Sequence, residues 1–158
     1  MKKILPMLFA VSCLINCATS NNDAGKNTNS GNFSDVIGKE FKLIEVQIDS
    51  TPSERIVLDA RTNDTYTIRF DGSIVSGVGA PNRYSAPYSS SDDQTIKIEL
   101  LRSTLMASIF QNEKIPEHNY YNYLQNSYKW EINSGTLILH SKTENNRNVR
   151  LIFGLFTA

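Results

Sequence analysis

Cysteine is scarce in this chain of 158 residues: the sequence contains two, Cys13 and Cys17, and both lie near its N-terminus. No thiol follows Cys17, which excludes a disulfide, a cysteine nucleophile and a thiolate metal site from the rest of the sequence. The folded part of the chain must therefore rely on its hydrophobic core. Hydrophobic residues make up 40% of the sequence, with seven Tyr and seven Phe, which is enough for a core of moderate size.

Histidine and clustered positive charge are also scarce. His118 and His140 are the two imidazoles, whereas a zinc site needs three or four converging ligands, so we expect no metal. Without Lys2 and Lys3, 14 basic residues stand against 16 acidic ones, a net charge of −2, and no long basic run is present. Phosphate binding needs a clustered positive surface, so we expect no nucleic-acid partner.

The glycine-rich and acidic segments do not match catalytic or cofactor motifs. Gly72–Gly77 has the wrong spacing for a nucleophile elbow and lies between two predicted strands, whereas the elbow joins a strand to a helix. Gly77-Val78-Gly79 opens no helix in a βαβ unit, so a dinucleotide site is not expected. Asp92-Asp93 lacks the alternating ligands of a calcium loop. The sequence therefore predicts neither an enzyme nor a bound cofactor.

The first seventeen residues have the pattern of a bacterial lipoprotein signal. Lys2 and Lys3 precede an apolar run over Ile4–Ile15, which is shorter than the roughly twenty residues needed to span a ~30 Å hydrocarbon core. Leu14-Ile15-Asn16-Cys17 is close to a lipobox, although a small residue usually stands where Asn16 is. We expect residues 1–16 to be a signal peptide and Cys17 to carry lipid. The alternative is an ordinary secretory signal with an incidental cysteine.

The segment that follows is predicted to be a flexible tether. Ala18–Asn32 consists almost entirely of Asn, Ser, Thr, Gly and Ala, and cannot bury enough apolar surface to offset the entropy of ordering. A coil of this length reaches about 20 Å. We therefore expect residues 17–32 to hold one domain, residues 33–158, close to a membrane surface. The expected location is the bacterial cell envelope, at the outer membrane or periplasmic face.

From Phe33 onward the sequence predicts short strands. Turn signals at Asp71-Gly72, Asn133-Ser134-Gly135 and Asn145-Asn146 separate segments in which apolar residues alternate with polar ones. Such alternation is typical of strands with one buried face, so we expect an antiparallel barrel or sandwich. The alternating segments are Ile44–Ile48, Tyr66–Phe70, Tyr84–Tyr88, Ile96–Leu100, Tyr128–Ile132, Leu137–Leu139 and Val149–Phe153.

Helical spacing interrupts the strands in one region. Tyr120, Tyr121 and Leu124 recur at helical spacing behind Pro116, which suits the first turn of a helix, so we predict a helix over Pro116–Gln125. An apolar cluster before this helix is predicted to form a short helical turn that covers one end of the barrel. Its members are Leu105, Met106, Ile109 and Phe110.

Several of these segments resemble the META domain, the family that includes the HslJ heat-shock-inducible lipoproteins. The resemblance covers roughly Phe33 to Phe153. Many members carry two cysteines at positions that here are Ala80 or Pro81, and Ser108, so the resemblance implies that these positions lie near each other. The matching pieces, in the family's order, are Gly38–Leu43, Ser76-Gly77, Gly79–Tyr84, Ser103–Ser108, Glu117 with Tyr120 and Leu124, Gly135–Leu139 and Leu151–Phe153.

The resemblance implies a small antiparallel β-barrel of lipocalin-like architecture with one packed helix. It also implies a non-catalytic protein with a role in envelope stress or virulence. A candidate recognition surface lies in the family's most distinctive segments: Asn82, Arg83, Tyr84, Tyr88 and Glu117. The alternative is structural, with Asn82 in a turn, Glu117 in the first helical turn and the tyrosines in the core.

Two other binding roles remain open at this stage. A lipocalin-like barrel holds a small apolar ligand if its interior is empty. An inhibitor of an envelope hydrolase such as lysozyme needs a protruding loop, for which Ala80–Ser91 is the candidate. The expected partners are the membrane, through lipid on Cys17, and an envelope protein, and we expect a monomer. Five aromatic side chains are predicted to fill the barrel: Tyr66, Phe70, Tyr84, Trp130 and Phe153.

Overall fold

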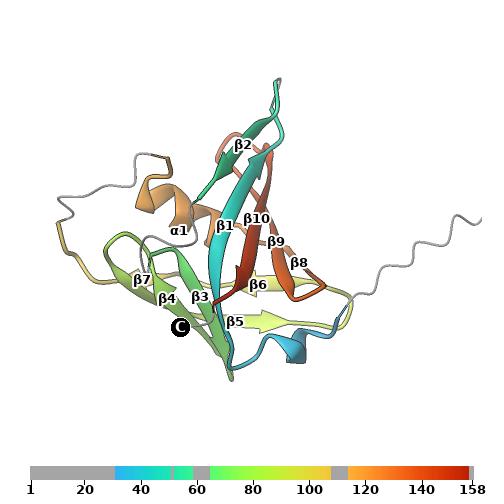
Figure 1. The fold of residues 1–158 in the computed structure, drawn as a ribbon. Coiled ribbons are helices and arrows are strands. Elements are labelled where there is room, and N and C mark those ends of the chain that lie inside the picture. Colours follow the sequence, from blue (N-terminus) through green and yellow to red (C-terminus); the bar gives the residue numbers. More distant parts are fainter. Residues whose placement is uncertain (1–30, 51, 59–64, 108–113, 157–158) are drawn as a thin grey trace, which may run out of the picture.

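A computed structural model of the chain describes residues 31–50, 52–58, 65–107 and 114–156 (Figure 1). Over these residues the chain is mainly β, with one α-helix and one short 3-10 helix. In chain order the elements are η1 (Phe33–Asp35), β1 (Glu40–Ile48), β2 (Glu54–Val57), β3 (Thr67–Asp71), β4 (Ile74–Val78), β5 (Arg83–Ser90), β6 (Ile96–Ile98), β7 (Arg102–Ser103), α1 (Glu117–Gln125), β8 (Lys129–Asn133), β9 (Thr136–Lys142) and β10 (Asn148–Leu155).

The strands form one antiparallel sheet that curls into a nearly closed barrel. Their order is β6-β5-β4-β3-β1-β10-β9-β8, while β2 pairs with β1 and β7 with β5. The two ends of this order meet, because the Trp130 N–H donates to the Gln94 carbonyl at 2.8 Å and the Ile96 N–H to the Tyr128 carbonyl at 3.2 Å. The predicted small antiparallel barrel with one packed helix is therefore confirmed.

The predicted turns join consecutive strands. The β3–β4 connection is Gly72-Ser73, with Gly72 at φ +57°, and the β8–β9 connection is Ser134-Gly135, with φ of +48° and +79°. Asn146, between β9 and β10, has φ +59°. Gly and Asn tolerate such positive φ values better than other residues, and turns of this kind match the twist of paired strands.

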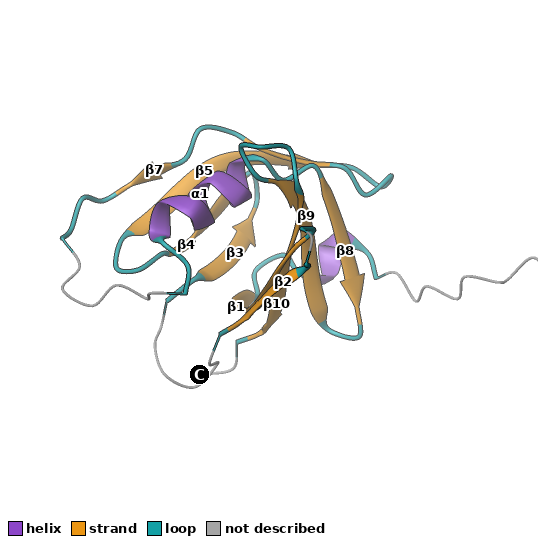
Figure 2. Cartoon of the chain, turned by 90° about the horizontal axis from the view of Figure 1, so that it is seen from above, coloured by secondary structure: helices purple, strands orange, loops and turns teal. Residues whose placement is uncertain are grey.

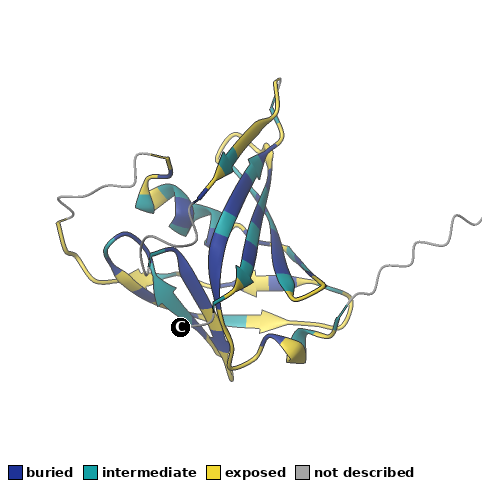
Figure 3. Cartoon of the chain, in the orientation of Figure 1, coloured by how far each residue is buried: buried dark blue, intermediate teal, exposed yellow. Residues whose placement is uncertain are grey.

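Aromatic side chains fill the barrel interior. Figure 3 shows the buried residues in dark blue along the barrel strands. The rings of Phe33 and Trp130, and those of Phe33 and Phe70, have centroids 5.1 Å apart. The five aromatic side chains that were predicted to fill the barrel, from Tyr66 to Phe153, are at most 4% exposed. These rings occupy the space that an apolar ligand needs inside a lipocalin-like barrel.

Helix α1 lies against the barrel, as the view from above shows (Figure 2). Its buried residues are Tyr120 and Leu124, which have the predicted helical spacing. On β9 the Ser141 hydroxyl donates to the Tyr123 carbonyl at 2.6 Å, and on the β3 side the Tyr120 hydroxyl donates to the Thr67 carbonyl at 3.1 Å. Pro116 is the N-cap of the helix rather than its first residue.

The predicted strand over Ile44–Ile48 lies within β1, but the predicted inward orientation of Ile44 is wrong because of a β-bulge. The pairing of β1 with β10 shifts between Leu43 and Glu45. Leu43 and Val46 both face the core, so Ile44 turns to the outer face and is only half-buried. An extra residue in one strand reverses the alternation, and nothing in the apolar pattern marks its position.

Three further apolar residues lie at the surface instead of in the core. Leu100 follows β6 and is 75% exposed, and Leu105 is 98% exposed. Leu105 and Met106 form no helical turn, which corrects the predicted cover at this end of the barrel. Ile109, Phe110 and Ser108 lie outside the described residues, as do the predicted signal peptide, Cys17 and nearly all of the tether. Among the described residues, no helix has the length and apolar character needed to cross a membrane.

Candidate functional site

Glu117, in the first turn of α1, is bound to the β4–β5 connection. Its Oε1 accepts hydrogen bonds from the N–H groups of Ala80 at 2.5 Å and Asn82 at 2.8 Å. Its Oε2 accepts a third hydrogen bond, at 2.7 Å, from Asn82 Nδ2. Two residues that the sequence marked as candidates are thus brought into direct contact.

Asn82 also joins this connection to the segment after β7. Its Oδ1 accepts hydrogen bonds from the Thr104 hydroxyl at 2.9 Å and from the Met106 N–H at 2.6 Å. The Tyr121 hydroxyl donates to the Asn82 carbonyl at 3.1 Å. We call Asn82, Thr104, Glu117 and Tyr121 the Asn82 network; it joins three segments that are distant in the sequence.

The network holds Glu117 in its charged form. Burial by itself raises the pKa of this carboxyl, but the hydrogen bonds from Asn82 and Ala80 together outweigh burial and lower the pKa below its ordinary value. Gly79 leaves room for the carboxylate, because a Cβ at this position would collide with Glu117 Oε1 and with the Tyr121 hydroxyl. This geometry gives Asn82 and Glu117 a structural task.

The tyrosines near this network are buried and neutral. The Tyr84 and Tyr120 hydroxyls lie 3.1 Å apart, and both donate to the Thr67 carbonyl, at 2.8 and 3.1 Å. Burial raises the pKa of both residues well above the ordinary tyrosine value. These groups keep their protons at any physiological pH and act as hydrogen-bond donors inside the barrel.

The five residues of the candidate recognition surface therefore lie in different environments. Asn82 is 6% exposed and Tyr84 is 4% exposed, whereas Arg83 is exposed and Glu117 is half-buried. Tyr88 is half-buried and lies apart from the network, with its ring centroid 4.8 Å from that of Phe70. Arg83 and the accessible parts of Glu117 and Tyr88 are what a partner can reach without moving the core.

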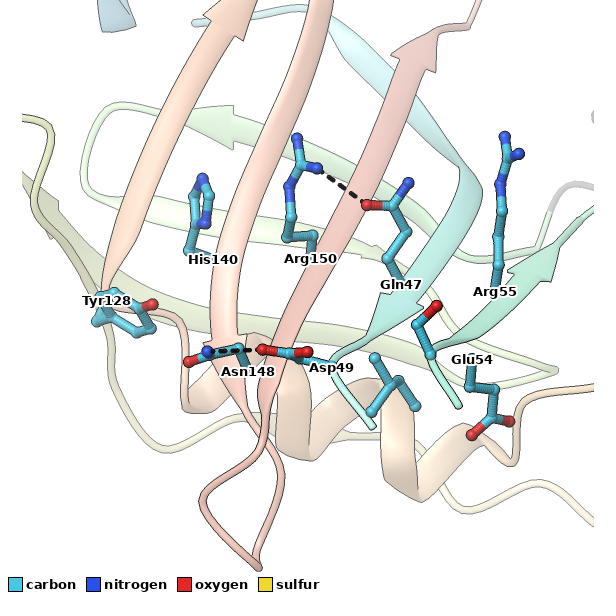
Figure 4. Close-up of a pocket in the computed structure, with 10 residues that line it drawn as sticks. Gln47, Asp49, Glu54, Arg55, Tyr128, His140, Asn148 and Arg150 are labelled. Atoms are coloured by element: carbon cyan, nitrogen blue, oxygen red, sulfur yellow. Dashed lines mark hydrogen bonds between the residues drawn. The ribbon is translucent and has the colours of Figure 1, made fainter. Parts of the chain in front are cut away.

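A second feature, which the sequence did not predict, lies on the outer face of the barrel. Four polar side chains from four neighbouring strands form a row there: Arg55 on β2, Gln47 on β1, Arg150 on β10 and His140 on β9 (Figure 4). Gln47, Arg150 and His140 each have buried neighbours on their own strands, such as Val46 and Ile48 beside Gln47, while the neighbours of Arg55 on β2 are exposed or half-buried. Because side chains alternate between the two faces of a strand, these four point away from the core.

This row forms one side of a hollow of about 550 Å³, which we call the outer hollow. Asp49, Asn148 and Tyr128 line it below the row, and residues 53–55 line it on the β2 side (Figure 4). The volume lies within the range of about 300–1,000 Å³ that is typical of small-molecule sites.

Hydrogen bonds fix three of the four side chains in the row. Arg55 donates twice to the Glu45 carboxylate, from Nε at 2.5 Å and from Nη2 at 2.6 Å, and Gln47 Nε2 donates to the same carboxylate at 2.6 Å. Gln47 Oε1 in turn accepts from Arg150 Nη1 at 2.9 Å. The hydrogen bond from Arg55 is the largest contribution to a lowered pKa of Glu45, which stays ionised. The positions of Gln47 and Arg150 are therefore set before any ligand arrives.

Two buried nitrogen atoms lie at the other end of the row. His140 Nε2 lies 3.2 Å from Glu131 Oε1, and Arg150 Nε is buried without a hydrogen-bond partner among the described residues. Burial lowers the pKa of His140 by more than Glu131 raises it, so the imidazole is neutral at pH 7. An unpaired buried polar atom costs about 1–3 kcal/mol, and such atoms often belong to a binding site.

The outer hollow is suited to binding. Its two carboxylates, Asp49 and Glu54, balance its two guanidinium groups, Arg55 and Arg150. Over the residues that the structure describes, no group of three His, Cys, Asp or Glu side chains is placed to hold a metal ion. The sequence analysis overlooked the hollow because its residues are polar strand positions, which have the same pattern as an ordinary solvated face.

The fold and these two features define a small antiparallel barrel with a filled interior, a helix fastened to it by the half-buried carboxylate of Glu117, and a hollow outside that polar side chains line. The chain belongs to the META domain family, whose model matches residues 34–152. No curated protein matches the sequence.

A solved structure shares the fold. A protein from Burkholderia xenovorans, determined by NMR, superposes with a TM-score of 0.58 at 17% identity, over 79% of this chain and 86% of that one. At this identity the likeness establishes the fold alone. A DUF4847 family protein from Bacteroides vulgatus superposes with a TM-score of 0.47 at 11% identity, over 75% of this chain and 93% of that one.

Proposed function

We propose that this protein is a lipid-anchored, non-enzymatic META-domain protein of the bacterial cell envelope that acts by binding. The observation that supports binding most directly is the outer hollow, in which hydrogen bonds to Glu45 position polar side chains on a rigid sheet. We also propose a role in envelope stress or virulence, which is what the family resemblance implies.

The anchor is proposed from the N-terminal residues. Lys2 and Lys3, the apolar run and Leu14-Ile15-Asn16-Cys17 fit export and lipidation, and the polar residues after Cys17 fit a tether. The folded domain begins near Phe33, so the tether separates it from the lipid by enough chain to leave the outer hollow accessible.

The two alternative binding roles lose support. Aromatic rings fill the barrel interior, so an apolar ligand has no evident place there. The candidate inhibitory loop, Ala80–Ser91, consists largely of strand β5, which is paired with β4 on one side and with β6 and β7 on the other. A strand held within a sheet does not protrude into the active site of another protein.

The experiment that tests the anchor compares the native protein with Cys17→Ser by intact mass and detergent partitioning, in the native host. Cys13→Ser is the matched control, because it removes the other cysteine and leaves the lipobox unchanged. We expect a lipid-sized mass increment in the native chain and in Cys13→Ser, and its loss in Cys17→Ser. A native chain without lipid contradicts the anchor.

A further inference from the structure

The charge of the outer hollow restricts the chemistry of its ligand. Asp49 and Glu54 contribute two negative charges, Arg55 and Arg150 contribute two positive charges, and Arg55 is already held by Glu45. A polyanion such as a nucleotide or a phosphorylated lipid would meet the two carboxylates as well as the guanidinium groups. The balance favours an uncharged ligand.

The polar side chains that line the hollow favour a ligand that carries hydroxyl groups. Hydroxyls both donate and accept hydrogen bonds, and the lining offers both kinds of partner. Asp49 supplies carboxylate oxygens, while Arg150 supplies N–H donors beside the imidazole of His140. Asn148 Nδ2 donates to Asp49 Oδ2 at 3.3 Å, so the acceptor side of the hollow is held in place, as Arg150 is by Gln47.

An aromatic ring lies at one end of the hollow. Tyr128 directly precedes β8, and its side chain is 44% exposed. Its ring centroid is 6.4 Å from that of His140. An exposed tyrosine offers an apolar face and a polar hydroxyl together. A sugar ring presents the complementary surface, with C–H groups on its face and hydroxyls around its edge.

We propose that the outer hollow binds a neutral sugar unit of one or two rings. One ring packs against Tyr128, and the hydroxyls bond with Arg150, His140 and Asp49. This assignment rests on the proposed binding function and names its ligand class. The sugar is either a free saccharide or part of an envelope polysaccharide, since both present the same ring and hydroxyl groups.

The test is titration calorimetry of the full chain in detergent micelles with N,N′-diacetylchitobiose, cellobiose and maltose. We expect at least one disaccharide to bind with a Kd of about 0.1–10 mM, the range for a small ligand in an open site. Tyr128→Ala is expected to weaken that binding about tenfold or more. Leu105→Ser is the matched control, because Leu105 is 98% exposed and does not line the hollow.

His140→Gln is a second variant, at the residue whose ring centroid lies 6.4 Å from that of Tyr128, and circular dichroism checks that each variant is folded. The proposal is overturned if none of the three disaccharides binds up to about 20 mM. It is also overturned if folded Tyr128→Ala and His140→Gln bind as tightly as the native chain, or if acetate or phosphate binds there and the sugars do not.

Co-sedimentation with purified peptidoglycan sacculi distinguishes the two sources of sugar. Retention on sacculi that is lost in Tyr128→Ala supports the site and assigns it to a polysaccharide. Binding of a soluble disaccharide without retention on sacculi supports the site and assigns it to a free sugar. Lipidation of Cys17 is measured independently by mass, so failure of sugar binding and failure of the anchor are separate results.

Discussion

Glu117 Oε2 accepts a hydrogen bond of 2.7 Å from Asn82 Nδ2, although the two residues are 35 positions apart in the sequence. The contact fastens the start of α1 to the β4–β5 connection. Because the same carboxylate also accepts two backbone N–H groups, it replaces the water that these donors would otherwise bind.

Replacing Glu117 by glutamine is expected to destabilise the domain. The new side-chain amide can keep one acceptor oxygen, but its NH₂ group then faces the donors that the carboxylate satisfied. We expect a loss of about 1–3 kcal/mol in the free energy of unfolding, measured by urea denaturation. Glu144→Gln is the control, since Glu144 is exposed and accepts one hydrogen bond from Asn122. Equal stability of the two variants would contradict a structural role for Glu117.

Acid is expected to weaken the same contact. The pKa of Glu117 is lower in the folded state than its ordinary value of 4.5, so the folded state binds its proton less readily than the unfolded state does. The stabilisation is therefore complete above about pH 4.5 and is lost as the pH falls through the folded-state pKa. Urea denaturation between pH 3 and 6 measures this effect, with Glu117→Gln showing a shallower fall. If the stability of the native protein and that of Glu117→Gln fall with the same slope, the result contradicts this prediction.

His140 is expected to add a second pH dependence, near neutrality. Burial lowers its pKa below the ordinary 6.5, against the opposing effect of Glu131 and with small contributions from Lys129 and Arg150. The neutral form is favoured in the folded state, so stability is full above about pH 6.5 and falls as the pH drops through the lowered pKa. Thermal unfolding between pH 5 and 8 checks this. We expect His140→Gln to flatten the curve and His118→Gln, at an exposed position, to leave it unchanged.

Gly79→Ala is expected to disturb the Asn82 network by steric collision. The added methyl group would collide with Glu117 Oε1 and with the Tyr121 hydroxyl, forcing one of them to move. We expect a loss of about 1–3 kcal/mol, as for overpacking of a filled interior. Gly154→Ala is the matched control, because a Cβ there meets only Ile44, at 3.5 and 3.7 Å. If Gly154→Ala proves as destabilising as Gly79→Ala, the collision is not the cause.

Much of the fold was predictable from local residue patterns. Pro116 marked the beginning of the helix, and Tyr120 and Leu124 marked its buried face. Gly72 and Gly135 marked two hairpin turns. In each case the signal lies within a few residues, where backbone preference and apolar spacing act directly. The bulge that displaces Ile44 was not predictable, because it depends on how β1 pairs with β10.

The site was less accessible to sequence reasoning. Asn82 and Glu117 were marked by a family resemblance, which did not reveal that they bind each other. The outer hollow depends on strand register: Gln47 and Arg150 are 103 positions apart and meet because β1 and β10 pair antiparallel. A polar residue at the outward position of a strand has the same sequence signature whether its neighbours are water or a binding site.

The pairing of β1 with β10, from Phe41 with Leu155 to Ile48 with Val149, also has a consequence for biogenesis. Because β1 pairs with β10, the barrel cannot be completed until the residues of both strands are available. Contacts between residues so far apart slow folding. If the proposed signal exports the chain N-terminus first, we expect it to remain unfolded during translocation and to close its barrel only after the C-terminal strand has crossed.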